Sequence, residues 1–131
     1  MIIAIDFDGT IVKNAYPNIG EILPRAKEVI NKLYNEGHII IINSNRVSKT
    51  QGEAEDFLKI KGIKFHYFNT NYPGEIIKWG IDSRKISADV YIDDKSIFTD
   101  EINWDEIEYL LKIKEEQYMI KNCIIQSKNN E

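Results

Sequence analysis

The chain begins with a short aliphatic run that ends in two acids. Residues Ile2 to Ile5 are all apolar, and Asp6, Asp8, Gly9 and Thr10 follow directly. A continuous apolar run of this length is typical of a strand buried on both faces of a parallel sheet. In open α/β sheets, ligands bind beyond the carboxyl ends of the strands. The opening segment therefore predicts an α/β fold whose functional site lies at this edge of the sheet.

Strands and helices are expected to alternate along the rest of the chain. The further expected strands are His38 to Asn43, Ile63 to Phe68 and Val90 to Ile92. The expected helices run from Pro24 to about Glu36, from a cap at Ser48 or Thr50 to about Lys61, and onward from an Asn103 cap paired with Glu106. Lys13 to Gly20 and the surroundings of Asn71 to Gly74 read as loops, the latter followed by a helical turn. Alternation of this kind predicts right-handed crossovers and a three-layer α/β/α, Rossmann-like fold with a central parallel sheet.

Apolar spacing indicates which side chains are buried. The first two expected helices would bury one face each, formed by Ala26, Val29, Ile30 and Leu33, and by Ala54, Phe57, Leu58 and Ile60. Trp79 and Trp104 are interpreted as packing residues. The tail from about residue 119 could be an extra helix or frayed, with fraying expected from Lys128.

Composition limits the classes of protein to consider. The 131 residues suit one domain, residues 1–131, and the net charge of −4 disfavours nucleic acid as a partner. The longest aliphatic runs are too short to span a membrane, and the start lacks the charges of a signal peptide, so a cytoplasmic protein is expected. A single cysteine, Cys123, and two histidines exclude an internal disulfide and a Cys/His zinc cluster.

Polar side chains follow each of the better defined strands. Ser44 follows the second apolar strand, Asp93 and Asp94 follow the last, and Lys85 precedes that pair. In a parallel sheet these strand ends share one edge with Asp6 and Asp8. Carboxylates gathered there would repel one another unless a cation lay between them, and an all-oxygen site calls for Mg²⁺.

An anionic substrate is the natural partner for the remaining groups. Lys85 and Ser44 could bind it, and the backbone N–H groups of Phe7, Asp8 and Gly9 could form an anion-binding nest. The substrate that these residue types imply is a phosphate.

The motif Asp6-Phe7-Asp8-Gly9-Thr10, followed in order by Ser44, Lys85 and Asp93-Asp94, resembles the four motifs of the haloacid dehalogenase superfamily of phosphotransferases. The resemblance covers Ile2 to about Ile97 and is nearest to small bacterial members without a cap domain. Neither Thr10 to Gly37 nor Arg46 to Arg84 has room for a cap.

The resemblance implies a role for each of these residues. Asp6 would be the nucleophile that forms an aspartyl-phosphate, and Asp8 the acid and then the base. Mg²⁺ would be held by Asp6, the Asp8 backbone carbonyl and an acid of the last pair, with Asp94 favoured over Asp93. Lys85 would hold Asp6 and the phosphate. The other substrate-phosphate contacts would be Phe7, Gly9, Ser44, Asn45 and Arg46.

Simpler interpretations stay open for several of these residues. The first motif could be an acidic, solvated turn, and Ser44 could merely cap a turn. Lys85 could be a surface lysine, with Lys95 or Lys78 in its place. Arg46 is as well explained as an ordinary surface arginine. A receiver domain is rejected because its acidic pair comes early in the chain, whereas Asp93 and Asp94 come late.

The function expected is a Mg²⁺-dependent phosphatase acting on phosphate monoesters. Without a cap the site would be open, which suits a phosphate on a bulky molecule or closure by a second subunit. Tyr16, Tyr72 and Met119 to Ile125 could supply contacts in a homo-oligomer. The alternatives are a phosphatase for nucleotides or nucleic-acid ends, and a phosphate-binding or interaction module without turnover.

Overall fold

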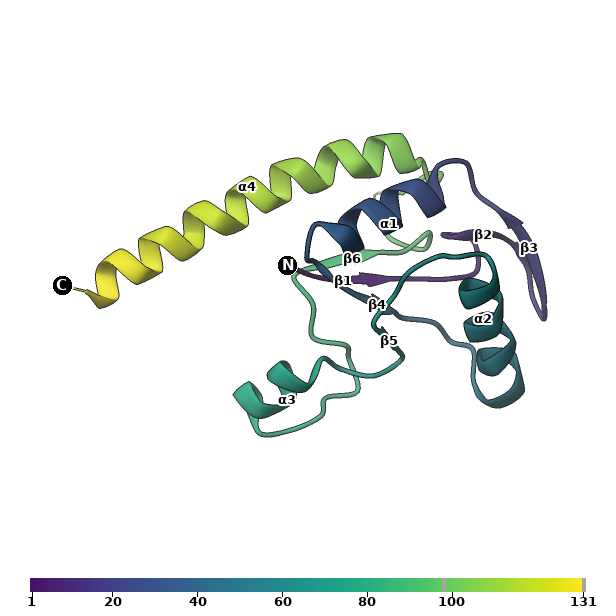
Figure 1. The fold of residues 1–131 in the computed structure, drawn as a ribbon, viewed down its shortest axis with the longest axis horizontal. Coiled ribbons are helices and arrows are strands. Elements are labelled where there is room, and N and C mark those ends of the chain that lie inside the picture. Colours follow the sequence, from purple (N-terminus) through teal and green to yellow (C-terminus); the bar gives the residue numbers. More distant parts are fainter. Residues whose placement is uncertain (98, 131) are drawn as a thin grey trace.

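The chain forms one parallel sheet and a separate hairpin. In a computed structural model that describes residues 1–97 and 99–130, four strands lie in the order β5-β4-β1-β6 and are parallel to their neighbours (Figure 1). These strands are β1 (Ile2–Ile5), β4 (Ile39–Ile42), β5 (Tyr67–Phe68) and β6 (Val90–Ile92). The register pairs Ile5 with both Ile42 and Ile92. The predicted α/β fold with a parallel sheet is confirmed.

Four helices accompany the sheet, close to their predicted places. They are α1 (Ala26–Asn35), α2 (Ser48–Ile60), α3 (Pro73–Trp79) and α4 (Trp104–Asn129). Gly37 and Gly62 follow α1 and α2 with φ of +92° and +70°, a backbone conformation that glycine adopts most easily. Asn103 caps α4, since its side chain accepts the N–H groups of Asp105 and Glu106.

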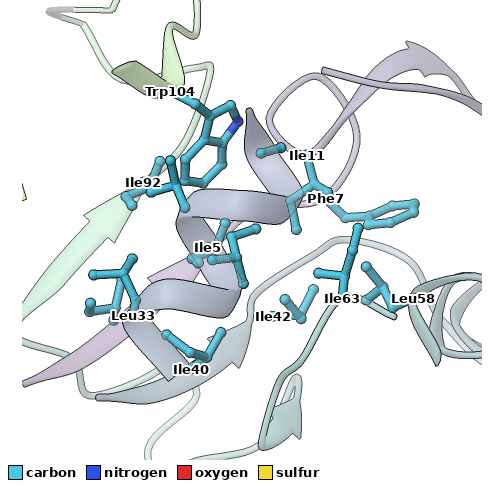
Figure 2. Packing of buried hydrophobic residues seen from close by; sticks show 14 of the residues in the cluster. Ile5, Phe7, Ile11, Leu33, Ile40, Ile42, Leu58, Ile63, Ile92 and Trp104 are labelled. Atoms are coloured by element: carbon cyan, nitrogen blue, oxygen red, sulfur yellow. The ribbon is translucent and has the colours of Figure 1, made fainter. Parts of the chain in front are cut away.

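The larger hydrophobic core lies between one face of the sheet and the helices α1, α2 and α4. Figure 2 shows Trp104 between Ile92 and Ile11, and Phe7 pointing toward Leu58 and Ile63. The predicted inner face of α1, formed by Ala26, Val29, Ile30 and Leu33, is fully part of this core. Alternation of side chains along β1 places Ala4 on the opposite face.

The opposite face of the sheet has a thinner cover. Ala4 and Ile41 pack there against Ile86, with Tyr72 and Ala88 beside them. The short helix α3 belongs to the segment on this side and has no buried residue. Most of the apolar burial of the fold is therefore on the α1 and α4 side.

The hairpin was not predicted. The segment expected to be a loop, Lys13 to Gly20, contains most of the antiparallel pair β2 (Val12–Ala15) and β3 (Asn18–Ile22). The side chains of residues 13–18 are exposed, so no apolar alternation marks these strands in the sequence. Residues 6–25 and 43–89, all of them described, contain no cap domain, in agreement with the prediction.

The third predicted strand is much shorter than expected. Only Tyr67 and Phe68 of Ile63 to Phe68 pair with β4. The side chain of Asn31 on α1 accepts the Lys64 N–H at 2.8 Å and donates to the Gly62 carbonyl at 2.9 Å. These bonds hold the first part of the segment against α1, so it does not join the sheet.

Two predicted core residues are exposed instead. Ile60, in the last turn of α2, is 81% exposed, and Trp79, at the end of α3, is 64% exposed. Each lies at the end of its helix with no described element packed over it. Trp104 is buried, as predicted.

Helix α4 runs beyond the rest of the molecule. Its first half lies along α1, and its second half extends away from the fold (Figure 1). The tail is helical through Lys128 and Asn129, so the expected fraying from Lys128 is not observed. Glu131 lies outside the described residues. None of the described helices is both long and apolar enough to cross a membrane.

Candidate active site

Three acids from two neighbouring strand ends meet at one edge of the sheet. Asp6 follows β1, and Asp93 and Asp94 follow β6, which pairs with β1. One carboxylate oxygen from each of the three lies within 4.8 Å of the others. The parallel register therefore brings together the acids that the sequence placed at this edge.

Thr10 and Gly9 fix the arrangement of this acidic cluster. The Thr10 hydroxyl donates to Asp6 Oδ2 at 3.0 Å and accepts the Asp94 N–H at 3.1 Å. Gly9 has a φ of +83°, and a Cβ on it would lie 2.3 Å from Asp94 Oδ2. Trp104 supports the turn from α4, because its indole N–H donates to the Thr10 carbonyl at 2.9 Å.

Within residues 1–97 and 99–130, no basic side chain forms an ion pair with the acids of the cluster. The pKa of Asp6 is raised from its usual value near 3.8 to about 7: burial raises it most, the hydrogen bond with Asp94 and the charge of Asp93 also raise it, and the hydrogen bonds from Thr10 and the Phe7 N–H lower it. Ionised Asp6 is thus disfavoured without a cation. An all-oxygen group of carboxylates is the donor set that Mg²⁺ takes, so these residues fit that ion.

Asp8 does not belong to the acidic cluster. Its carboxylate forms a bidentate ion pair with Arg46, with Nε to Oδ2 at 2.7 Å and Nη2 to Oδ1 at 2.8 Å. The Arg46 side chain is 1% exposed, and its hydrogen bonds to Asp8 raise the pKa of the guanidinium. Arg46 is therefore not an ordinary surface arginine but the buried partner of Asp8, and its contact with a substrate phosphate stays a prediction.

Arg46 also fastens the hairpin to the site. Its guanidinium donates to the carbonyls of Pro17 at 3.1 Å and Asn18 at 2.9 Å, both at the β2–β3 turn. The ring of Tyr16 covers the guanidinium, with its centroid 5.1 Å from Cζ. A single buried arginine therefore joins the first motif, the loop after β4 and the hairpin.

Ser44 lies at the end of β4 as expected, with its backbone held in place. Its N–H donates to Asn69 Oδ1 at 2.8 Å, and its hydroxyl oxygen accepts the Arg46 N–H at 3.1 Å. Asn69 also donates to the Arg46 carbonyl at 3.1 Å and has a φ of +57°. Asn45 is exposed.

The predicted anion nest is only partly formed. The Gly9 N–H donates to the Val12 carbonyl at 2.8 Å, and the N–H groups of Thr10, Ile11 and Val12 all point to the Phe7 carbonyl. The turn after β1 therefore uses the Gly9 amide internally. This corrects the expectation that Gly9 binds phosphate through its N–H; the N–H of Phe7 is directed at Asp6 and lowers its pKa.

Lys85 does not hold Asp6 in this structure. It is exposed, and its Nζ lies 4.9 Å from the centroid of the Tyr91 ring. The ion pairs among the described residues include none between Lys85 and Asp6, Asp93 or Asp94. Lys78 lies over Trp79 in the same way. The predicted contact between Lys85 and Asp6 is thus replaced by one with Tyr91.

Sequence reasoning missed several residues that build the site. Asn69, the Arg46 ion pair and Trp104 were not recognised as parts of it, because their contacts span from 23 to 94 positions along the chain. Trp104 was assigned to packing only. One local signal existed for Arg46, since a basic residue follows Ser44 at a strand end where acids were already expected.

Comparison with known proteins identifies the family of the chain. A family model described as haloacid dehalogenase-like hydrolase matches residues 3–131. The chain belongs to this family. The resemblance inferred from the four motifs is therefore confirmed, and membership of a hydrolase family supports hydrolysis as the activity.

A solved structure has the same fold as this hydrolase-family member. It is described as the structure of a conserved protein coded by a locus from Bacteroides thetaiotaomicron. The two chains are 39% identical with a TM-score of 0.77, over 87% of this chain and 91% of the other. No curated protein matches the chain.

Proposed function

We propose that the protein is a Mg²⁺-dependent phosphatase that hydrolyses a phosphate monoester through an aspartyl-phosphate on Asp6. The observation that carries the proposal is the cluster of Asp6, Asp93 and Asp94 at the carboxyl ends of β1 and β6 in a hydrolase-family fold. The raised pKa of Asp6, about 7, supports a site built to be completed by a cation.

Mg²⁺ would be held by Asp6, Asp94 and the backbone carbonyl of Asp8, with Asp93 beside it. When bound, the ion supplies positive charge between the nucleophile and the phosphate. Two unit charges about 4 Å apart repel by roughly 4 kcal/mol at an effective dielectric of 20, so this neutralisation is a large part of the barrier.

The first half of the reaction transfers the phosphoryl group to the enzyme. An Asp6 carboxylate oxygen attacks phosphorus, and the bond to the ester oxygen breaks as that oxygen takes a proton from Asp8. This proton transfer requires Arg46 to release one oxygen of Asp8, because both oxygens accept hydrogen bonds from the guanidinium.

The second half returns the enzyme to its starting state. Asp8, as the carboxylate that Arg46 stabilises, accepts a proton from water, and the hydroxide attacks phosphorus to release phosphate from Asp6. Ser44 can support both halves. Its oxygen accepts the Arg46 N–H, which leaves its hydroxyl proton to donate to a phosphoryl oxygen.

The substrate phosphate would be carried on a bulky molecule. The segments between the motifs contain no cap domain, and the side chains of Asn45 and Lys85 are exposed. For Lys85 to bind phosphate, its flexible side chain must leave the ring of Tyr91. The net charge of −4 continues to disfavour nucleic acid as the carrier.

The test is hydrolysis of p-nitrophenyl phosphate with Mg²⁺ and with EDTA, by the wild type, Asp6→Asn and Asp56→Asn. Asp56 is an exposed acid on α2 and provides the matched control. We expect Mg²⁺-dependent turnover in the wild type and in Asp56→Asn, and a loss of at least a thousandfold in Asp6→Asn. Equal turnover of Asp6→Asn would refute the nucleophile assignment.

A phosphate-binding module without turnover is the second candidate. The observation that favours it is the position of Lys85 against Tyr91 rather than Asp6. Saturable binding of inorganic phosphate, with no metal-dependent hydrolysis across a panel of phosphate esters, would assign this function instead.

A further inference from the structure

The second half of α4 has no packing partner within the described chain. No residue from 112 to 129 is buried, and this half of the helix extends away from the fold (Figure 1). Isolated helices of about 12 residues are marginal in water, and most helical stability in proteins comes from packing. A helix that also exposes several large apolar residues implies a partner.

The accessible surface area of the chain also indicates that α4 has a partner. Its accessible surface is 8691 Å² at a mass of 15.3 kDa. A compact monomer of this mass is expected to expose about 7,100 Å², so the excess is roughly 1,500 Å². A stable interface buries about 800 Å² on each partner, so α4 has enough surplus surface for one.

The exposed residues of α4 follow a heptad pattern. Leu110, Ile113, Gln117, Ile120 and Ile124 are spaced alternately by three and four residues, which are the a and d positions of a coiled coil. This seam lies almost opposite Trp104 and Leu111, the buried residues of the helix. A partner could therefore reach the seam without meeting the body of its own chain.

The seam has a shallow, open hollow at a place where a coiled coil would insert a side chain from its partner. A hollow of about 310 Å³ is lined by Gln117, Ile120, Lys121 and Ile124, with Ile125 at its side. Four residues at positions a, d, e and the next a form the hole for a d-position side chain of a facing helix. The side chain that fits this hole in a second copy is Ile120 itself.

Charges beside the seam select the relative direction of the two helices. Lys114, Lys121 and Lys128 occupy the e positions, and Glu116 occupies a g position. In a parallel pair, Glu116 of one copy lies beside Lys121 of the other. In an antiparallel pair the e positions face each other, which would place Lys121 beside Lys114. Like charges at that distance disfavour the antiparallel pairing.

We infer that α4 binds a second copy of this chain as a short, parallel, two-stranded coiled coil along the seam from Leu110 to Ile124. Gln117 places one polar side chain at a central a position, where a polar residue can specify the register of the pair. Two heptads are few, so the dimer is expected to dissociate in the micromolar range. The inference uses no residue of the acidic cluster.

Sedimentation equilibrium of the full chain tests the dimer. We expect a dimer with a micromolar dissociation constant, and a monomer over the whole range up to hundreds of micromolar would overturn the proposal. Ile120→Glu is expected to raise the dissociation constant at least about tenfold. Met119→Glu is the matched control, because Met119 is 60% exposed and Ile120 61%, but Met119 lies outside the seam.

Equal effects of Ile120→Glu and Met119→Glu would also overturn the proposed seam. Circular dichroism of both variants checks that the helix is retained, so a lost dimer is not mistaken for a lost helix. Both positions are exposed in the single chain, so neither variant alters its core.

Direction is tested by charge reversal and by cross-linking. Lys121→Glu should weaken a parallel dimer, and adding Glu116→Lys should restore it. Antiparallel pairing predicts instead that Lys121→Glu strengthens the dimer, because the new glutamate would lie beside Lys114.

Cross-linking provides a second test of direction. In a Cys123→Ser background, the cysteine of Ile120→Cys should form a disulfide with the same cysteine of the second copy. Cross-links only between Gln117→Cys and Ile120→Cys chains would overturn the parallel arrangement, because an a position faces a d position in an antiparallel pair.

Discussion

Arg46 holds Asp8 in a buried, bidentate ion pair, whereas Asp6, two residues before Asp8, has no basic partner among its recorded contacts. Without a cation, the raised pKa of Asp6, about 7, favours its protonated form below neutral pH, while both carboxylate oxygens of Asp8 are engaged by Arg46. The first step of the proposed mechanism makes the opposite demands, because it needs an ionised Asp6 and a proton on Asp8 that can reach the leaving oxygen. A cation beside Asp6 would restore the first requirement, and release of Arg46 the second.

Replacement of Arg46 by alanine should strongly destabilise the protein. Asp8 would lose its partner while half-buried, and the hairpin would lose the bonds to Pro17 and Asn18. Breaking a buried pair costs about 3–5 kcal/mol, so we expect a loss of at least about 3 kcal/mol in the free energy of unfolding. Urea unfolding followed by the fluorescence of buried Trp104 measures it.

The control for Arg46 is the exposed ion pair of Lys49 with Glu53, whose charged atoms are 3.7 Å apart. Lys49→Ala should change the free energy of unfolding by no more than about 0.5 kcal/mol, because exposed pairs contribute little. Similar losses for Arg46→Ala and Lys49→Ala would contradict the structural role given to Arg46.

Asp6→Asn should stabilise the metal-free protein at alkaline pH. Asp6 has a pKa of about 7 when folded and near 3.8 ordinarily, so the folded state binds more protons between these values and loses stability as the pH rises. Asparagine carries no charge, so the variant should exceed the wild type by roughly 1–4 kcal/mol in EDTA at pH 8. The gap should shrink toward pH 4.

Unfolding in urea at pH 4.5 and pH 8 measures this gap between Asp6→Asn and the wild type. Mg²⁺ at pH 8 should narrow it, because a cation between Asp6, Asp93 and Asp94 favours the ionised carboxylate. A gap of the same size at both pH values would show that the raised pKa of Asp6 is wrong.

The sequence predicted those parts of the fold and site that follow from local pattern. Aliphatic runs identified β1, β4 and β6, and their parallel order was enough to place Asp6 beside Asp93 and Asp94. The spacing of apolar residues identified the buried face of α1, and Asn103 identified the start of α4. These features need only strand direction and helix periodicity.

The remaining features depend on contacts between distant residues. The length of β5 was overestimated because Asn31, on another element, binds the Lys64 N–H. Arg46 could not be assigned from its neighbours, since its partners Asp8 and Asn18 lie 38 and 28 positions away. No local pattern encodes such pairs, so the hairpin and its attachment were missed together.

Asp94→Asn should weaken Mg²⁺ binding more than Asp93→Asn. Asp94 contacts Asp6 and has its N–H fixed by Thr10, whereas Asp93 Oδ1 already accepts the Lys95 N–H at 2.9 Å. We expect Asp94→Asn to raise the Kd for Mg²⁺ about tenfold more than Asp93→Asn does, equivalent to about 1.4 kcal/mol. Calorimetric titration without substrate measures this. A larger effect of Asp93→Asn would make Asp93 the direct ligand.

Gly9→Ala should damage the site, whereas Gly52→Ala should stabilise the protein. A Cβ on Gly9 would lie 2.3 Å from Asp94 Oδ2, and the φ of +83° is strained for alanine. Asp94 must then move away from Asp6, so we expect Mg²⁺ affinity and phosphatase activity to fall at least tenfold.

Gly52 lies within α2 and provides the control, because a Cβ there would meet nothing within 4 Å. Alanine there should add about 0.5–1 kcal/mol of stability with unchanged activity. Full Mg²⁺ affinity in Gly9→Ala would mean that the close approach of Asp94 to the turn is not needed for the metal.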